Sequence, residues 1–312
     1  QILLKMTDQL LPRETVTRLP ESVMIFGCGY VGTALAEQLL AAGVRVGALT
    51  RNADQAERLR ALGLSEVVVA DLDRSTWHDQ LSGKYAGVVN CVSSAGGGID
   101  GYRQSYLEGQ RSILNWARGR RIETYVYTSS TSVYPQDGAV RVDETADTAE
   151  APPTGQVLCE SEQLLADAAG ELGAWTVLRL AGIYGPHRHY LLDMLRAGES
   201  VIPGVGDTLL NLIHRDDIVR ALCVVLAQGQ SGTSGIYNVS DNQPPTKAEL
   251  VAWLAEQLGR AAPVFDPDTV SPRLKRRGGR MPSRHIVNRK FCETFNWQPL
   301  YRDFRAGYAG LL

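Results

Sequence analysis

The feature that most constrains this chain is a glycine-rich turn, Gly27-Cys28-Gly29-Tyr30-Val31-Gly32, with the spacing G-x-G-x-x-G. A short apolar run, residues 23–26, precedes the turn, and a helix-patterned segment, residues 33–42, follows it. In this setting the first glycine permits a tight turn, the second lets a diphosphate approach the main chain, and the third allows close packing of helix on strand. The helix start then faces the phosphate charge. The turn therefore predicts a dinucleotide site, with a purely structural turn as the alternative because the chain holds 31 glycines.

Apolar runs and helical patterns continue to alternate after this turn. Strands are predicted over residues 44–50, 66–70, 87–92 and 124–128, and helix-patterned segments such as residues 106–118 separate them. This alternation predicts an α/β fold, a Rossmann-type doubly wound parallel sheet with a smaller C-terminal substrate lobe. The predicted boundaries are an N-terminal extension over 1–21, a dinucleotide-binding domain over 22–184 with 208–240 returning to it, and a substrate lobe over 185–207 and 241–312.

Composition excludes several classes of function. The 312 residues carry a formal net charge of −2, so the chain lacks the basic field that nucleic-acid binding usually needs. No apolar stretch reaches the ~20 residues that span a bilayer, and residues 1–11 make a poor signal peptide. The five cysteines are widely spaced, odd in number and form no C-x-x-C pair, which predicts a reduced, cytoplasmic protein without structural zinc.

The end of the second strand bears on which dinucleotide the chain prefers. An acidic residue there would bind a ribose 2′-hydroxyl and repel a 2′-phosphate. Thr50 and Arg51 stand there instead, and a guanidinium can form paired hydrogen bonds with a phosphate. Arg51 therefore predicts NADP as the cofactor, with NAD as the alternative, although a solvated surface arginine is the other interpretation in a chain with 32 lysines and arginines.

Further motifs follow in a recognisable order. They are Ala70-Asp71-Leu72, Tyr106-Leu107-Glu108-Gly109, Tyr127-Thr128-Ser129-Ser130-Thr131-Ser132-Val133-Tyr134, residues 176–186 ending in Ile-Tyr-Gly-Pro, Ile213-His214-Arg215-Asp216-Asp217-Ile218, and Ile236-Tyr237-Asn238-Val239. Together with the glycine turn they resemble the extended short-chain dehydrogenase/reductase family, the epimerase and dehydratase group that acts largely on nucleotide sugars. The resemblance covers residues 22–312 and is more specific for the fold than for the reaction.

The resemblance implies roles for particular residues. The glycine turn, including Tyr30 and Val31, would hold the diphosphate, and Ser130 would hydrogen-bond the substrate oxygen that gains or loses a proton. The remaining cofactor contacts would come from Asp71 and Leu72 at the adenine, from Val92, Ser93 and Ser94 at the nicotinamide ribose, and from Ile183 and Tyr184 at the nicotinamide. Without the resemblance, Ser130 would be interpreted as a strand-end cap, and Ile183 and Tyr184 as a strand leading into a turn.

One departure from the family pattern concerns the reaction directly. Family members carry Tyr-x-x-x-Lys ahead of a glutamate, and aligning Glu162 with that glutamate puts Thr154 at the tyrosine and Leu158 at the lysine. A tyrosine, with an ordinary pKa of ~10, works near neutral pH only when a cation stabilises its phenolate. Threonine hardly ionises, and leucine carries no charge. No lysine occurs between Lys84 and Lys247, so shifting the alignment does not restore the pair.

Three explanations remain open. Another group can supply the proton: Tyr106 occupies a helix position near the expected site, and Tyr102, His187 and His189 stand on loops that we expect to face it. Alternatively, the proton comes from water or from the substrate, with Ser130 orienting the groups. In the third explanation, the protein binds the dinucleotide without turnover, as a redox-state sensor would.

The substrate is expected in the second lobe. Ser132, His187 and Arg188 are candidate substrate contacts, and the basic segment 271–290 includes Arg280 and Arg284 as candidate clamps for a nucleotide-sugar diphosphate. A solvated basic loop is the alternative for that segment. No metal site is expected, because the His187-Arg188-His189 run lacks a third ligand nearby. We therefore predict an NAD(P)-dependent oxidoreductase, epimerase or dehydratase that acts on a nucleotide sugar or a similar hydroxyl or carbonyl substrate with non-standard acid-base residues. A non-catalytic NADP(H)-binding sensor is the alternative, and a homodimer is left open.

Overall fold

The computed structural model describes residues 18–94, 96–229, 232–269 and 281–312. The chain forms two compact units. Within the described residues, unit 1 comprises the chain up to Ser130, Pro153–Arg179 and Ile218–Tyr237, and unit 2 comprises Thr131–Pro152, Leu180–Asp217 and the chain from Asn238 onward.

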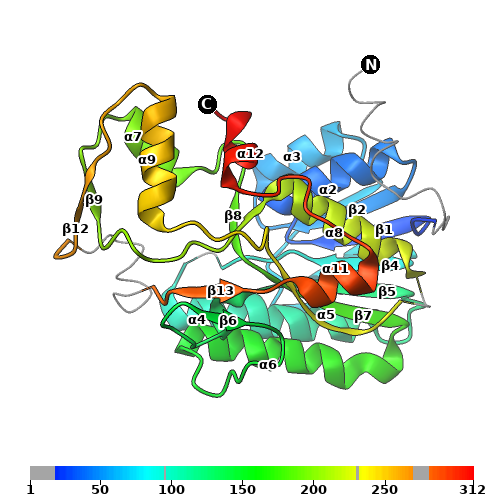
Figure 1. Ribbon diagram of the computed structural model, residues 1–312. Helices are drawn as coiled ribbons and strands as arrows, with labels where there is room; N and C mark the ends of the chain where they lie inside the picture. The colour runs from blue at the N-terminus through cyan, green and yellow to red at the C-terminus, as the bar shows by residue number, and fades with distance from the viewer. Residues whose placement is uncertain (1–17, 95, 230–231, 270–280) are drawn as a thin grey trace. The chain divides into compact units, whose positions relative to one another are not determined.

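Unit 1 is built on a seven-stranded sheet (Figure 1). Its strands are β1 (Ser22–Phe26), β2 (Arg45–Thr50), β3 (Glu66–Val69), β4 (Gly87–Asn90), β5 (Thr124–Ser130), β7 (Ala174–Leu180) and β11 (Gly235–Val239). Their order is β11-β7-β5-β4-β1-β2-β3, and β1 pairs in parallel with both β2 and β4. This order reverses direction at β1, so the predicted Rossmann-type doubly wound parallel sheet is confirmed.

Helices cover both faces of this sheet. The longer ones are α2 (Tyr30–Ala41), α3 (Ala53–Ala61), α5 (Gly109–Ala117), α6 (Pro153–Asp167) and α8 (Arg215–Ala227); the short segments are η1 (Ser75–Gln80), α4 (Gly98–Tyr102), the π-helical η2 (Arg103–Glu108) and η4 (Ala168–Glu171). All five residues of β1 are buried, as expected for a central strand under helices on both sides. On one face Phe26 packs against Trp77 and Trp116, with ring centroids 5.1 and 5.3 Å away. This aromatic cluster fixes the strand whose end carries the glycine turn.

Unit 2 consists of short elements. They are η3 (Thr131–Val133), β6 (Val140–Val142), β8 (Gly182–Tyr184), α7 (Tyr190–Arg196), β9 (Val201–Pro203), β10 (Leu212–His214), α9 (Lys247–Gln257), β12 (Val264–Asp266), β13 (Arg284–Ile286), α11 (Arg289–Phe295) and α12 (Phe304–Ala309). Three two-stranded parallel ladders form, β10 with β8, β12 with β9, and β13 with β6. A separate apolar core around Tyr184, Leu192, Leu250 and Tyr308 holds the unit together.

Some element boundaries differ from those predicted. The helix after the glycine turn begins at Tyr30 rather than at residue 33, because Gly29 serves as its N-cap. The helix predicted over 106–118 begins earlier, as α4 and the π-helical η2, before continuing as α5. In the described part of the chain, no helix is both long and apolar enough to cross a membrane. No group of three potential metal ligands occurs there either.

Candidate functional site

A different structural feature explains the presence of glycine at each of the three glycine positions in the turn between β1 and α2. Gly27 has φ +74°, and a Cβ there would lie 2.6 Å from the backbone nitrogen and Cα of Val92. Gly32 packs α2 on β1, because an added Cβ would meet Ile25 Cγ2 at 3.1 Å. Gly29 is exposed at the tip, where an added Cβ would meet nothing closer than a main-chain oxygen 3.9 Å away. The main chain at Gly29 is therefore open to a ligand.

The start of α2 suits a negatively charged ligand. Among the described residues, no side chain caps this end of the helix and no acidic residue lies in its first turn. The partial positive charge of the helix start therefore meets no side-chain anion there. Tyr30 is half-buried and Val31 is buried, so the open surface at the turn is mainly backbone. A dinucleotide diphosphate fits this arrangement of open main chain and helix end.

Arg51 lies just beyond the end of β2, fully on the surface. It lines a shallow cavity of about 450 Å³ together with Asn52, Ala53 and Asp54. Asn52 caps α3, since its side chain accepts a hydrogen bond from the Gln55 amide at 3.0 Å. In the described residues, the Arg51 guanidinium has no ion-pair partner, so it can meet a phosphate, while Asp54 places one negative charge in the same cavity.

The next predicted cofactor contacts lie on the chain segments that follow β3 and β4 in unit 1. Asp71 is exposed after β3, whereas Leu72 is buried in the core. After β4, Val92 is buried against Gly27, and Asn90 Oδ1 accepts its amide hydrogen at 3.1 Å. Ser93 is exposed and Ser94 is half-buried, with the Ser94 hydroxyl accepting the Gly96 amide at 3.2 Å. Val92 therefore fixes the shape of the glycine turn, and Ser93 is the more accessible of the two serines.

The three predicted catalytic residues all belong to unit 1. Ser130 is the last residue of β5, Tyr106 lies in the π-helical η2, and Thr154 lies in the first turn of α6; all three are half-buried. The ring of Tyr106 lies 4.5 Å from that of Tyr102, and its carbonyl accepts a hydrogen bond from Ser161 of α6 at 3.0 Å. π-Helical turns are rare and recur at functional sites, so η2 adds an independent reason to consider Tyr106.

Helix α6 has no room for a lysine at the position of Leu158. The Leu158 side chain is fully buried. One turn further on, the Glu162 carboxylate pairs with Arg179 of β7, with Nη2 and Oε2 2.7 Å apart, and accepts a hydrogen bond from Ser129 at 2.5 Å. All three of these polar residues are buried, each at most 5% exposed as a whole residue. The helix therefore keeps a buried polar anchor at Glu162, one turn beyond the buried apolar Leu158.

Tyr127 is a buried tyrosine close to these residues in the sequence motif that ends β5. It lies on β5 and is fully buried. Burial raises the pKa of Tyr127 well above its ordinary value. Ser161 partly opposes this shift, and the nearby Tyr106 and Glu162 add to it. Tyr127 therefore stays protonated near neutral pH and does not substitute for an activated tyrosine.

In unit 2, Tyr184 is held inside the core. It is 3% exposed, stacks on Tyr308 with centroids 4.8 Å apart, and its hydroxyl has no partner among the described residues. A Cβ at Gly307 would overlap that hydroxyl, at 1.8 Å, so glycine is required there. Burial raises the pKa of Tyr184 above its ordinary value. Ile183, its neighbour on β8, is half-buried and more accessible.

The predicted substrate residues are distributed over separate parts of unit 2. Ser132 is half-buried in η3, and His187 and Arg188 are exposed in a tight turn where His187 has φ +61°. Arg284 is 7% exposed, and its guanidinium donates to the carbonyls of Gln136 and Thr131 at 3.1 and 2.9 Å. Those bonds tie β13 to the segment that follows β5. Arg280 lies outside the described residues.

Two buried ionisable groups in unit 2 carry no sequence motif for catalysis. Asp241 is 4% exposed, its Oδ1 accepts the Gln243 amide at 3.0 Å, and its Oδ2 is buried without a partner in the described residues. Burial, with Asp303 and Asp217 adding to it, raises the pKa of Asp241 to about 7. Burial lowers the pKa of His214 to about 4. Only the fold reveals these environments, because nothing in the local sequence predicts burial of an aspartate in a loop.

The sheet order, the glycine turn and the helix start together define a dinucleotide-binding protein of the Rossmann class. Residues 23–240 match the sequence profile of the NAD dependent epimerase/dehydratase family. The chain belongs to this family, whose members are NAD-dependent enzymes.

Individual proteins resemble the chain over most of its length. Protein YeeZ of Escherichia coli (strain K12) is 30% identical over 252 residues, which are 78% of this chain and 86% of that protein. A 3-diazoavenalumate denitrifying reductase from Streptomyces is 28% identical over 313 residues, 91% of this chain and 98% of the reductase. The structure of MoeE5 in complex with UDP-glucose and NAD superposes with a TM-score of 0.75 at 23% identity, covering 92% of this chain and 96% of MoeE5. At that identity the superposition shows a shared fold.

Proposed function

We propose that the chain is an NADP-preferring oxidoreductase that acts on a hydroxyl or carbonyl carbon of a small substrate. The observation that carries this proposal is the combination of an open glycine turn at Gly29 with an unpaired Arg51, and no acidic side chain, directly after β2. Arg51 offers a planar pair of donors to a 2′-phosphate. Family membership supports a nicotinamide cofactor, and Arg51 supports the phosphorylated form.

The bound nicotinamide would supply or accept a hydride, and the protein's own residues would orient the groups. The half-buried Ser130 hydroxyl, at the carboxyl end of β5, would hydrogen-bond the reacting oxygen. Thr154 would contribute at most a neutral hydrogen bond, because its hydroxyl does not ionise near neutral pH. The proton would then pass through Tyr106, water or the substrate itself. The buried Leu158 leaves no cation on α6 to lower the pKa of a phenol there.

Two substrate classes follow from the comparisons. The bound UDP-glucose in MoeE5 supports a nucleotide sugar, and oxidation and reduction would then be steps within epimerisation or dehydration. The 28% identical Streptomyces protein is named a reductase, and this supports net reduction of a carbonyl or similar group instead. In a nucleotide-sugar enzyme, Ser132, His187, Arg188, Arg280 and Arg284 would be the candidate contacts.

The second candidate function is a dinucleotide-binding sensor without turnover. The specific observation in its favour is that the α6 positions of the acid-base pair hold Thr154 and a fully buried Leu158. Such a protein would keep the glycine turn and Arg51 and still bind the cofactor. Binding alone therefore does not separate the two functions.

The separating experiment measures turnover with each cofactor. Purified protein would be incubated with NADPH, NADP, NADH or NAD together with nucleotide sugars or with 3-oxo acids and aryl ketones, following absorbance at 340 nm and detecting products by chromatography that separates epimers, coupled to mass spectrometry. We expect cofactor-dependent product formation that falls about 100-fold in Ser130→Ala, with cofactor affinity unchanged. Stoichiometric cofactor binding with no absorbance change and no product in any mixture would instead support the sensor.

We further propose that the protein is a cytoplasmic homodimer. The odd number and wide spacing of the five cysteines support a reducing compartment. The resemblance to the family implies that the dimer would form through helices of the Rossmann unit. Light scattering of the purified protein tests it, since a mass near 34.0 kDa would show a monomer.

A further inference from the structure

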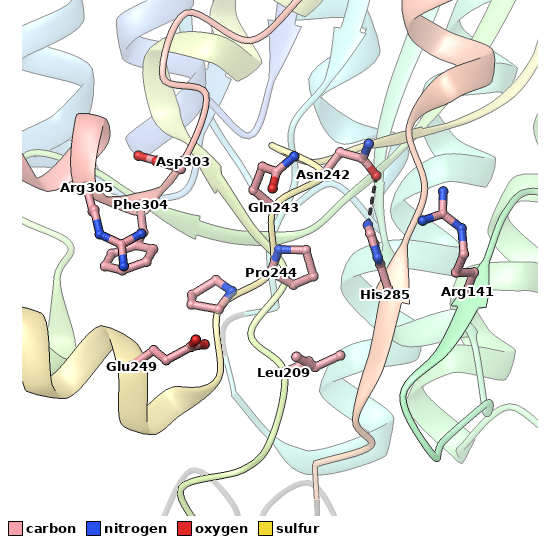
Figure 2. A pocket seen from close by; sticks show the side chains of 11 residues that line it. Arg141, Leu209, Asn242, Gln243, Pro244, Glu249, His285, Asp303, Phe304 and Arg305 are labelled. Carbon is pink, nitrogen blue, oxygen red and sulfur yellow. Dashed lines mark hydrogen bonds between the residues drawn. The ribbon is translucent and has the colours of Figure 1, made fainter.

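A second cavity, of about 470 Å³, lies wholly within unit 2 (Figure 2). Five stretches of chain form it: Arg141 of β6, Leu209, the segment from the turn at 242–245 to Glu249 in the first turn of α9, His285 of β13, and residues 303–305 at the start of α12. None of its lining residues belongs to the glycine turn or to the end of β5. The cavity is therefore a candidate binding site distinct from the cofactor turn.

One wall of this cavity is basic. Arg141 of β6 and His285 of β13 are register partners in the parallel ladder, so their side chains lie next to each other on one face. The His285 ring bonds Asn242 Oδ1 at 2.9 Å, as the dashed line in Figure 2 shows. Burial, with the nearby Arg141 charge, lowers the pKa of His285. Arg141 is exposed, and in the described residues no carboxylate pairs with it.

The charges on the opposite wall already have partners. Glu249 accepts hydrogen bonds from the amide and hydroxyl of Thr246 in a capping box, and Asp303 caps α12 through the Ala306 amide. Arg305 lies over the Phe304 ring, 4.3 Å from its centroid, and its charge helps lower the pKa of Glu249. This wall therefore carries two carboxylates and one guanidinium, and it repels additional negative charge.

Charge and shape together limit the ligand. Formally, the two arginines balance Glu249 and Asp303, so the cavity has no surplus positive charge for a diphosphate. A ligand with a single negative charge can pair with Arg141 and keep that charge away from Glu249 and Asp303 on the opposite wall. Between the walls lie the apolar surfaces of Pro244 and Leu209, whereas Phe304 lies beside Arg305 on the opposite wall and is only 2% exposed. The volume falls in the range of ordinary small-molecule sites.

We propose that this cavity binds a small organic monocarboxylate with a ring or short apolar body. The carboxylate meets the Arg141 guanidinium through two parallel N–H···O bonds, and the body lies against Pro244 and Leu209. The site belongs to unit 2 alone and binds with or without the dinucleotide. The proposal therefore stands or falls independently of the proposed reaction.

The test is calorimetric titration of the full chain, without cofactor and at low salt, with 3-phenylpropanoate as the probe. Its neutral relative 3-phenylpropanol and the diphosphate UDP serve as comparison ligands. We expect one 3-phenylpropanoate per chain with an affinity of about 1 mM or tighter, at least about tenfold weaker binding of the alcohol, and no UDP binding that depends on Arg141.

Variants assign the binding to this cavity. Arg141→Gln should weaken 3-phenylpropanoate binding at least about tenfold, and Arg141→Lys should recover part of the loss because it keeps the charge without the planar pair of donors. Arg289→Gln, which removes an exposed arginine of α11 outside the cavity, should change the affinity less than about twofold. Circular dichroism would verify that each variant is folded.

Three results would overturn the proposal. The first is the absence of 3-phenylpropanoate binding at about 10 mM. The second is binding that folded Arg141→Gln leaves unchanged. The third is UDP binding that is tighter than that of the carboxylate and lost in Arg141→Gln, which would make the cavity a diphosphate site.

Discussion

The Glu162 carboxylate and the Arg179 guanidinium form a buried ion pair that joins α6 to β7. Arg179 Nη2 lies 2.7 Å from Oε2 and Nε lies 3.1 Å from Oε1, and the two side chains are 3% and 6% exposed. Removing one partner of such a pair costs about 3–5 kcal/mol, because the other charge is left buried and unpaired. The pair therefore anchors α6 to β7 one turn beyond the buried, uncharged Leu158.

The burial of Leu158 makes a prediction about restoring the family's lysine. Leu158→Lys should destabilise the protein by about 3–5 kcal/mol, because it places an ammonium group in the core. The nearby Glu162 carboxylate does not neutralise this charge, since it is already paired with Arg179. The matched control, Leu158→Met, keeps volume and polarity and should cost less than about 1.5 kcal/mol. Urea unfolding of the three proteins measures both differences. Equal stability of Leu158→Lys and Leu158→Met would show that a lysine is accommodated there.

The two glycines Gly27 and Gly29 should respond oppositely to alanine. Gly27→Ala should lower the melting temperature, because φ is +74° and the new Cβ would meet the Val92 backbone at 2.6 Å. Gly29→Ala should leave the fold largely intact, since its Cβ would enter open space, but should weaken dinucleotide binding at least about tenfold. Thermal melts and titration with NADPH distinguish these effects. A Gly29→Ala protein that binds NADPH like the parent would contradict the placement of the diphosphate.

Arg51 should discriminate between the two nicotinamide cofactors. Arg51→Gln should weaken NADPH binding at least about tenfold and leave NADH binding within about twofold, because only NADPH carries the 2′-phosphate. Arg58→Gln, which removes another exposed arginine from α3, is the control and should change neither affinity appreciably. If NADH binds the parent as tightly as NADPH, and Arg51→Gln alters neither, the preference for NADP is wrong.

Asp241 should make stability decline with rising pH. Its pKa is raised to about 7 in the folded protein, whereas an unfolded chain releases this proton near pH 4. Between these values the folded state binds the extra proton, so the free energy of unfolding should fall as pH rises from about 4 to 7 and then level off. Asp241→Asn should remove this fall and be more stable than the parent at pH 8, by on the order of 2 kcal/mol.

The measurement is the difference in thermal stability between parent and Asp241→Asn at pH 5 and pH 8. His214 acts with the opposite sign, because its lowered pKa, about 4, costs stability as pH falls below about 6.5. Since both proteins keep His214, the difference between them isolates Asp241. A difference that is the same at both pH values would show that Asp241 is ionised throughout.

Much of unit 1 could be predicted from the sequence because its signals are local. The run at residues 23–26, the glycine spacing and the alternating strands determine the sheet and the turn, since each signal spans only a few residues. Helix α2 begins three residues before the start predicted from the sequence, because Gly29 can cap a helix without any side-chain signal. The π-helical turn at Tyr106 was also missed, since i→i+5 bonding leaves no distinctive local pattern.

The class of fold, the glycine spacing and the absence of lysine between Lys84 and Lys247 can be read from the sequence alone. The burial of Leu158, the bonds of Arg284 to main-chain carbonyls, and the cavity shared by Arg141 and His285 become visible only in the folded chain. The difference lies in the distance along the chain over which each kind of interaction acts. Turns and helices depend on neighbours a few residues apart, whereas burial and side-chain bonding join segments that lie farther apart in the chain, 17 residues for Glu162 and Arg179 and 153 for Thr131 and Arg284.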